Sequence, residues 1–346
     1  MFVNKSVSPT NLIAFTGGHL IWISVWVTLV TSLHDVLHLH WLHMPWLPIS
    51  VLATAVAFYI GFKNNQAYDR LWEARKIWGG IVNSSRAWGS MSRAYLSNQF
   101  VANPQAAAEL KAMQQRLIYR HIAWLYVLRS QLLIPTNWEH INQGLHAKKN
   151  VRRMQKRIGV CLFSEKENVD KIVEDLLGKE EYEEMIGYKN MATQLIDKQA
   201  QELAGLRASG FINDFRHIDL QKILYHFYEH QGKCERIKKF PLPRQYGGMS
   251  AVFVGIFIFL LPFGMITEFH DYGAYGAWWS VPFTILIAWV YLTMELIGDY
   301  SENPFEGLGN DIPMLSLCRT IEIDLRQMLG EQDLPPAIEP INGVLM

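Results

Sequence analysis

The chain has 346 residues, of which 50% are hydrophobic and 18% are charged, and its formal net charge at pH 7 is zero. The hydrophobic share is too high for an ordinary soluble protein, and the charged share is too high for a protein buried wholly in a membrane. We therefore expect a membrane domain joined to a helical domain in water.

Two uncharged segments near the start of the sequence are long enough to cross a membrane. The first is Leu12–Leu33, and the second is Met44–Phe62. About nineteen residues, at roughly 1.5 Å each, cover most of a hydrocarbon core of about 30 Å. No small-residue cleavage pattern follows the first segment, so we expect it to stay as an uncleaved span.

The second span continues without a loop signal into a charged stretch with helical periodicity. We predict one long helix over Met44–Gly80 that leaves the membrane at Phe62–Lys63. Its membrane half is rich in small residues, which let helices approach closely or line a narrow passage. Leu47, Val51 and Ala55 follow one another at a spacing of four residues, so they share one helical face.

That shared face has two interpretations. If several copies of the helix surround an axis, the three positions form stacked apolar rings, which exclude water and close a pore by dewetting. Alternatively, the face packs on a neighbouring helix of the same subunit. The periodicity is compatible with both interpretations.

The predicted outer connection His34–His43 holds four histidines and one aspartate. His34 and His38 would share a face if the helix continued, which is compatible with a metal site or a proton site. The spacing matches no defined zinc pattern, however, and such polar aromatic residues are common at the depth of lipid headgroups. We favour a wet rim at the membrane surface.

Two further uncharged segments, Gly247–Thr267 and Tyr272–Thr293, are the third and fourth predicted spans. Neither outer connection contains Lys or Arg, whereas 29 of the 32 Lys and Arg lie between Lys63 and Arg244. Basic residues collect on the cytosolic side of a membrane protein. We therefore expect both termini in the cytosol and the protein in the cell's inner membrane.

The predicted fold is all-α and has four parts. They are the first two spans (1–62, with 44–62 as the candidate pore-lining helix), a cytosolic helical domain (63–246), the last two spans (247–298) and an acidic cytosolic tail (299–346).

Charge is uneven across the cytosolic segments. Residues 63–244 hold 29 bases and 19 acids, and the tail from Asp299 holds nine acids and two bases. The two regions either dock, within or between subunits, or stay as separate solvated surfaces. The basic stretch Lys148–Arg157 could bind nucleic acid, but anionic lipid or the acidic tail fits a domain beside a membrane better. We expect no nucleic-acid partner.

The sequence carries no catalytic signature. It has no nucleophile elbow, HExxH, CxxC or phosphate-binding loop. Cys161, Cys234 and Cys318 form no metal-type pair, and we expect no cofactor and no enzyme activity. Glu295 and Asp299 are the only acids close to membrane depth. Acids there are functional candidates, but we expect these two to pair with cytosolic helices at the interface.

Several segments resemble the bestrophin family, and they occur in the family's order. Phe62–Arg86 resembles the segment after its pore-lining helix, and Glu295–Leu325 resembles its NPF-containing tail. Cys234–Pro243 and Leu260–Met265 are shorter matches, while Arg120–Arg129 resembles the bacterial branch. The likeness covers nearly the whole chain.

This resemblance implies a homopentameric ion channel with four spans per subunit, a hydrophobic neck and a second constriction at the cytosolic exit. By alignment, the neck positions fall on Leu47, Val51 and Ala55, and the constriction falls on Ile218. The family's neck usually has bulkier residues than Ala55, so we expect a wider lower ring here.

The tail departs from the animal bestrophins, in which an acidic run after the NPF motif forms a calcium clasp. In the corresponding stretch of this chain, Glu306–Asp311, only Glu306, Asn310 and Asp311 offer side-chain oxygens. Calcium takes about six to eight oxygen ligands. We therefore expect no bound metal here and no calcium activation through this loop.

We predict passive conduction of monovalent ions across the bilayer, with anions favoured because the cytosolic domain is basic. A cation-selective channel of the same fold is the first alternative. A transporter or membrane enzyme is the second, although the sequence shows no internal repeat and no charge in the middle of a span. A scaffold without transport is the third.

Overall fold

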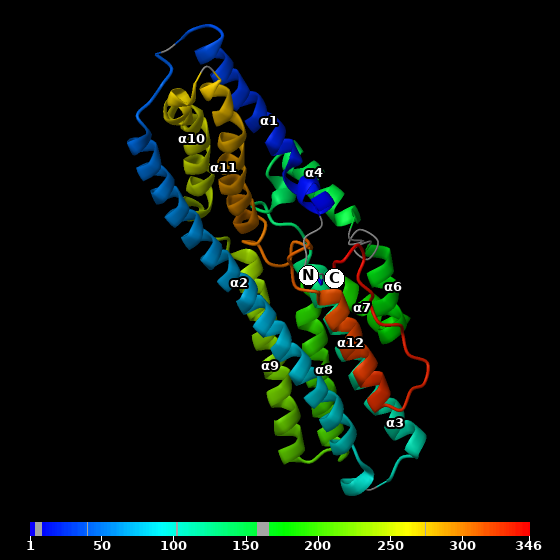
Figure 1. The fold of residues 1–346 in the computed structure, drawn as a ribbon. Coiled ribbons are helices and arrows are strands. Elements are labelled where there is room, and N and C mark those ends of the chain that lie inside the picture. Colours follow the sequence, from blue (N-terminus) through cyan, green and yellow to red (C-terminus); the bar gives the residue numbers. More distant parts are fainter. Residues whose placement is uncertain (4–8, 40, 102, 158–165, 274) are drawn as a thin grey trace. The chain divides into compact units, whose positions relative to one another are not determined.

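The computed structural model describes residues 1–3, 9–39, 41–101, 103–157, 166–273 and 275–346. Within these residues the regular secondary structure is helical, apart from isolated β-bridges (Figure 1). This confirms the predicted all-α class. The chain divides into two compact units, which are described separately.

Asn4–Arg70 and Pro241–Asn303 make up the first unit, here called the membrane unit. It contains α1, the start of α2, α10, the short η3 and α11, which span Pro9–Asp35, Trp46–Tyr95, Arg244–Phe269, His270–Tyr272 and Gly276–Asp299. The four long helices are all long and apolar enough to cross a membrane, which confirms the four predicted spans.

The helices of the membrane unit pack closely around an apolar core. Figure 1 shows α1, α10 and α11 side by side, and α11 contacts both of the others. Ile49, Val56 and Ile60 of α2 join that core. A Cβ atom at Gly264 of α10 would collide with Ile49, so this glycine permits the close approach of α10 and α2.

Two boundaries in the membrane unit differ from the prediction. The fourth span begins at Gly276, because Tyr272 lies in η3, and α11 continues to Asp299. At the same end of the unit as Gly276, α1 continues to Asp35, so His34 belongs to the helix and not to a loop.

Met1–Val3, Leu71–Phe240 and Pro304–Met346 make up the second unit, here called the helical unit. After the end of α2 and the short η1 (Asn98–Phe100), it contains α3, η2, α4, α6, α7, α8, α9 and α12. These span Ala107–Leu132, His140–Asn142, Leu145–Arg157, Lys166–Leu177, Lys179–Ile186, Met191–Ala208, Asp214–Lys239 and Met314–Met328.

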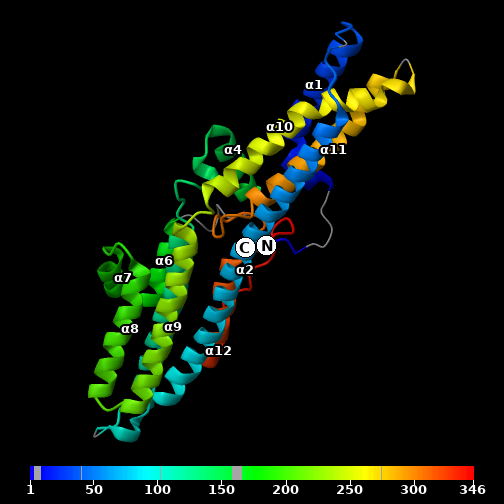
Figure 2. The same cartoon turned by 90° about the vertical axis from the view of Figure 1, so that its left-hand side faces the viewer.

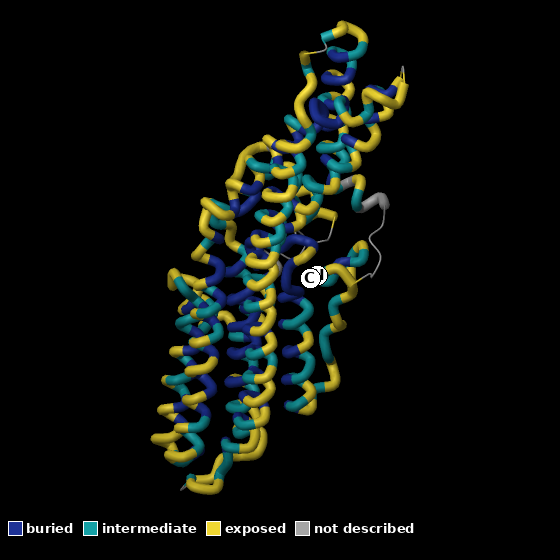
Figure 3. Tube along the Cα trace, turned by 60° about the vertical axis from the view of Figure 1, so that its left-hand side comes forward, coloured by how far each residue is buried: buried dark blue, intermediate teal, exposed yellow. Residues whose placement is uncertain are grey.

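Helix α3 lies at the centre of the helical unit, because it contacts α6, α8, α9 and α12. Figure 2 shows α8 and α9 running side by side, and Figure 3 shows buried residues along the inner sides of the helices. Several polar side chains inside this core are paired. Arg120, for example, donates to Glu181 and Glu202, and the Tyr126 hydroxyl donates to Glu322 at 2.6 Å.

Helix α2 is longer than predicted, since it runs through Gly80 to Tyr95. The expected end at Gly80 was wrong for a packing reason. A Cβ at Gly80 would lie 2.6 Å from Cε1 of His230, so this glycine makes room for α9 instead of ending α2. The buried residues Trp78, Ile81 and Trp88 hold the extra turns against the core.

The acidic tail docks on the helical unit of its own chain. Asp324 pairs with Arg86 at 2.8 Å, and Glu322 accepts from Tyr126. The last residues run back to the start of the chain, where Val3 N donates to Gly343 O at 3.0 Å. Figure 1 shows the two chain ends next to each other. Docking within the subunit is thus the alternative that the structure supports.

Candidate pore-lining faces

One side of the membrane half of α2 is apolar and exposed. Leu47 is 73% exposed and Val51 63%, and Ala55 is exposed as well. The same face continues to Phe58 and Phe62, at 70% and 69%. The opposite side of the helix is buried in the membrane unit, so the five residues face something other than their own unit.

The hydroxyls near this face are satisfied within the helix itself. Ser50 Oγ donates to Leu47 O at 2.8 Å, and Thr54 Oγ1 donates to Ser50 O at 3.0 Å. Hydroxyls bonded back to the preceding turn have little need of a further partner. The face therefore remains effectively apolar along its length.

A buried ion pair fixes α2 where its charged half begins. Lys63 Nζ lies 2.5 Å from Glu295 Oε1, and both side chains are almost fully buried. Ser250 Oγ also donates to Glu295 at 2.7 Å, and Asp299 lies 3.9 Å from Lys63. Glu295 and Asp299 thus pair with α2, the structural role expected for them.

Two arginines bind the segment that follows α11. Arg70 Nε donates to Glu302 O at 3.0 Å, and Arg244 Nη1 lies 3.3 Å from Glu302 Oε1. Because Arg70 is on α2, Arg244 opens α10 and Glu302 follows α11, the pairs hold these three helices together in the membrane unit.

Helix α9 presents the second candidate face. Its start is fixed by Asn213, whose side chain accepts from Arg216 N at 2.9 Å. Leu220, Leu224 and Phe227 turn inward and are buried. Ile218 faces outward and is 52% exposed.

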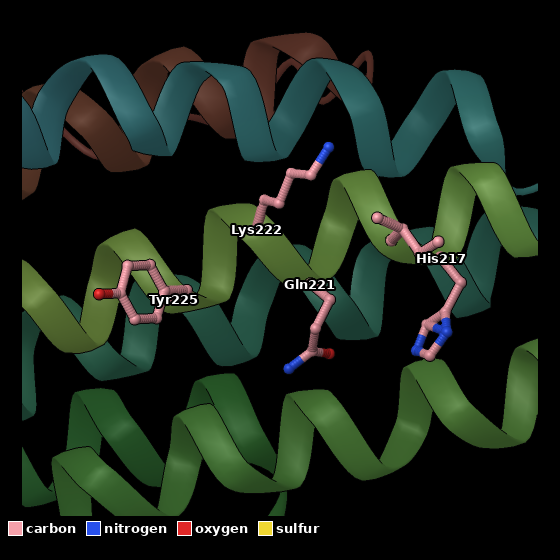
Figure 4. A pocket seen from close by; sticks show the side chains of 5 residues that line it. His217, Gln221, Lys222 and Tyr225 are labelled. Carbon is pink, nitrogen blue, oxygen red and sulfur yellow. The ribbon is translucent and has the colours of Figure 1, made fainter.

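The outward side of α9 mixes apolar and polar groups. An open pocket there is lined by His217, Ile218, Gln221, Lys222 and Tyr225. Figure 4 shows His217 and Gln221 extending from one side of α9 and Lys222 from the other. Lys222 Nζ donates to Asp219 Oδ1 at 3.1 Å, so both charges lie within one turn of Ile218.

The loop that contains Glu306 and Asp311 corresponds to the calcium clasp of animal bestrophins. Here its oxygens accept hydrogen bonds from groups of the protein itself. Glu306 accepts from the backbone N of His140 at 2.6 Å, and its Oε2 lies 2.8 Å from His140 Nδ1. Lys238 Nζ donates to Phe305 O at 3.2 Å and pairs with Glu139. Burial raises the pKa of the Glu139 carboxyl, while the nearby Lys238 opposes that shift.

Asp311 is enclosed by the same loop. Its carboxylate accepts backbone N–H groups from Phe305, Gly307 and Ile312, at 2.9, 2.8 and 2.7 Å. Burial raises the pKa of Asp311, and the three N–H donors act against that shift. Asn310 is exposed, unlike Glu306 and Asp311. The carboxylates of Glu306 and Asp311 thus hold the loop in its conformation by accepting hydrogen bonds.

The histidine-rich connection gathers no evident metal ligands. Among the described residues, no three His, Cys, Asp or Glu side chains come together in a way that could hold a metal ion. Asp35 Oδ2 accepts from Trp278 Nε1 at 2.7 Å. His40 and Cys161 lie outside the described residues, and Cys234 and Cys318 are buried free thiols.

Comparison with known sequences decides the family. The family model described as "Bacterial/Fungal Bestrophin protein" matches residues 13–327. The chain belongs to this bestrophin family.

Curated relatives of this bestrophin carry the names of channels. It is 26% identical, over 85% of its length and 80% of the relative's, to the "Voltage-dependent anion channel-forming protein YneE" of Escherichia coli (strain K12). A "Voltage-dependent anion channel-forming protein" of Mesorhizobium japonicum is also 26% identical, over 85% of this chain and 77% of that one. The expectation of a channel and not an enzyme agrees with these names.

Solved structures agree on the fold. A bacterial bestrophin homologue from Klebsiella pneumoniae superposes with a TM-score of 0.70 at 21% identity, covering 91% of this chain and 98% of that one.

Sequence reasoning missed two features of these faces. Phe58 and Phe62 continue the Leu47 face, and their spacing of seven and eleven residues from Val51 was a usable signal. The pairing of His140 with Glu306 joins residues 166 positions apart, and no local pattern points to it.

Proposed function

We propose that this bestrophin is an anion channel, a homopentamer in which the exposed face of α2 lines an axial pore. The observation that carries the proposal is that face: five apolar residues, exposed along the membrane half of a helix whose other side is fully packed. In five copies the face would form a continuous apolar passage, and such passages gate by dewetting.

Leu47, Val51 and Ala55 are the proposed neck. Ala55 is the small member, so its ring is wider than those of Leu47 and Val51. Phe58 follows one turn later on the same face with a much larger side chain. The passage thus alternates in width, with the methyl side chains of Ala55 between two bulkier layers.

Ile218 is the proposed cytosolic constriction. It is an exposed apolar residue on the outward side of α9, which also exposes Phe215 and Tyr225, while Leu220 and Leu224 turn inward. In five copies Ile218 would narrow the exit, while Lys222 and Asp219 would place charge beside it.

Two observations support anion selectivity. Relatives covering most of the chain are named for anion channels. Residues 63–244 also carry more bases than acids, and a basic vestibule raises the local anion concentration. Asp219, one residue from Ile218, is the feature that favours the cation-selective alternative.

Calcium independence is the next part of the proposal. Glu306 and Asp311 already accept hydrogen bonds from His140 and from three backbone groups. A calcium ion would have to displace these donors and still find most of its ligands elsewhere.

We also propose insertion in the inner membrane with both termini in the cytosol, because the outer connections lack Lys and Arg.

The experiment is chloride efflux from liposomes that contain the purified protein, with the potassium ionophore valinomycin supplying counter-ion movement. We expect efflux that does not change when calcium is chelated. The A55F variant, which fills the wide ring, should conduct less. If intact wild-type oligomers gave no efflux, the proposal of a channel would be wrong. If efflux depended on calcium, the proposal of calcium independence would be wrong.

A further inference from the structure

Helix α4 carries a stripe of cations on one side. Lys149, Arg152, Arg153 and Lys156 follow one another at spacings of three, one and three residues, so they lie on one helical face, and all four are exposed. Leu145 falls on the same face and is 89% exposed. The helix contains no acidic residue.

The other side of α4 is attached to the helical unit. Val151 is 2% exposed, and Gln155 Nε2 donates to Glu306 O at 3.2 Å. At the end of the helix, Asn342 Nδ2 donates to Arg157 O at 2.5 Å. These contacts fix which face points away from the unit, so the cationic stripe is an outward surface.

The stripe is not neutralised by its own chain within the described part of the structure. Asp324, Glu322 and Glu331 of the acidic tail pair with Arg86, Tyr126 and Arg326 instead. None of the four cations has an acidic partner among the described residues. The tail therefore does not explain the charge on α4.

The chain also ties α4 to a segment that leaves a membrane span. Gln155 of α4 donates to Glu306 O. Glu306 comes only seven positions after Asp299, the last residue of α11. About four or more Lys or Arg gathered on an amphipathic helix near a membrane are typical of segments that bind anionic lipid headgroups. Each such Lys or Arg near an anionic membrane adds to the attraction.

We propose that the α4 stripe, Lys149, Arg152, Arg153 and Lys156 with Leu145, binds the anionic phospholipid headgroups of the surrounding bilayer. The four cations meet the headgroup phosphates, and Leu145 enters the boundary between headgroups and acyl chains. This proposal needs the protein to be inserted in a membrane but does not depend on ion conduction.

The test is amide hydrogen exchange of residues 145–157 in the full protein, held in nanodiscs of phosphatidylcholine alone or with added phosphatidylglycerol. We expect exchange of α4 to slow several-fold with phosphatidylglycerol, and high salt to remove most of the effect by screening. The K149Q/R152Q/R153Q/K156Q variant should exchange at one rate in both nanodiscs. Because no flux is measured, failure here is separate from failure of the channel.

The matched control is K111Q/K171Q/K179Q/K189Q, which removes four exposed cations from other parts of the helical unit. It should keep the wild-type response to phosphatidylglycerol. Equal exchange of wild-type α4 in both nanodiscs would overturn the proposal. Equal protection by inorganic phosphate in detergent would also overturn it, since the surface would then be a general anion site. Protection by RNA but not by lipid would assign the stripe to nucleic acid.

Discussion

The exposed face of α2 and the exposed face of α9 differ in chemistry. The α2 face is apolar from Leu47 to Phe62, with its neighbouring hydroxyls bonded within the helix. The α9 face sets Ile218 among Asp219, Lys222 and Gln221. An apolar ring controls whether water and ions enter, but it has no charge with which to tell an anion from a cation. From this difference we propose that α2 controls gating and that α9 influences charge selectivity.

The two helices are also held differently. A buried ion pair, Lys63 with Glu295, fixes α2 in the membrane unit, and a second one, Lys238 with Glu139, fixes the end of α9. The middle of α9 is held by packing. His121 of α3, for example, stacks on Phe227 of α9 with ring centres 4.3 Å apart. Different substitutions and conditions should therefore weaken the attachment of each helix.

The largest effect should come from K63M, which breaks the attachment of α2. It leaves Glu295 buried without its cation, and removing one partner of a buried pair costs about 3–5 kcal/mol. Thermal unfolding of the detergent-purified protein measures the loss. The K63M/E295M double variant should recover much of it, and a double variant no more stable than K63M would show that the pair is not the cause.

Acid should weaken the packing behind α9. Burial lowers the pKa of His121 to about 3, below its ordinary value of 6.5, so between these values only the unfolded chain takes up the proton. The free energy of unfolding should then fall as the pH drops below 6.5, by about 2 kcal/mol between pH 7.5 and 5. Thermal unfolding at the two pH values tests this.

H121Q should lose less stability in acid than the wild type, because glutamine does not titrate and can still bond to Ser85, which lies 2.8 Å from His121 Nε2. The control is H226Q, which changes an exposed histidine of α9 and should leave the pH dependence intact. If H121Q and the wild type lost the same stability in acid, His121 would not be the cause of the acid sensitivity.

The V51S variant tests the gating role of α2. A hydroxyl in the apolar ring eases wetting, so conductance should rise several-fold while the anion-to-cation permeability ratio stays the same. Single-channel recording in planar bilayers measures both quantities. V252S, at an exposed position of α10, is the control and should behave as wild type. A changed permeability ratio in V51S would contradict the assignment.

K222E tests the selectivity role of α9 and should have the smallest effect. Reversing this charge beside Ile218 should reduce the anion-to-cation permeability ratio about two- to threefold, with little change in conductance. K233E is the matched control, because Lys233 also pairs with an acid on α9, at 2.8 Å from Glu229. If K233E shifts the ratio as much as K222E, the effect is one of total charge and not of position.

Much of the architecture could be predicted from local patterns. Uncharged runs located the four spans, and the four-residue spacing placed Leu47, Val51 and Ala55 on one helical face. That this face is exposed came from the structure. Contacts between distant segments could not be predicted. Lys63 and Glu295 are 232 positions apart, and nothing near Gly80 shows that His230 packs over it. Such pairings depend on packing, which a single sequence does not display.

The most direct test of the central claim is the reversal potential of the purified protein in a planar bilayer under a KCl gradient. The account predicts a reversal near the chloride equilibrium potential, because the apolar neck admits ions without choosing their sign and the excess of bases in residues 63–244 favours anions. A reversal near the potassium equilibrium potential would contradict it and would make Asp219 the charge that decides selectivity.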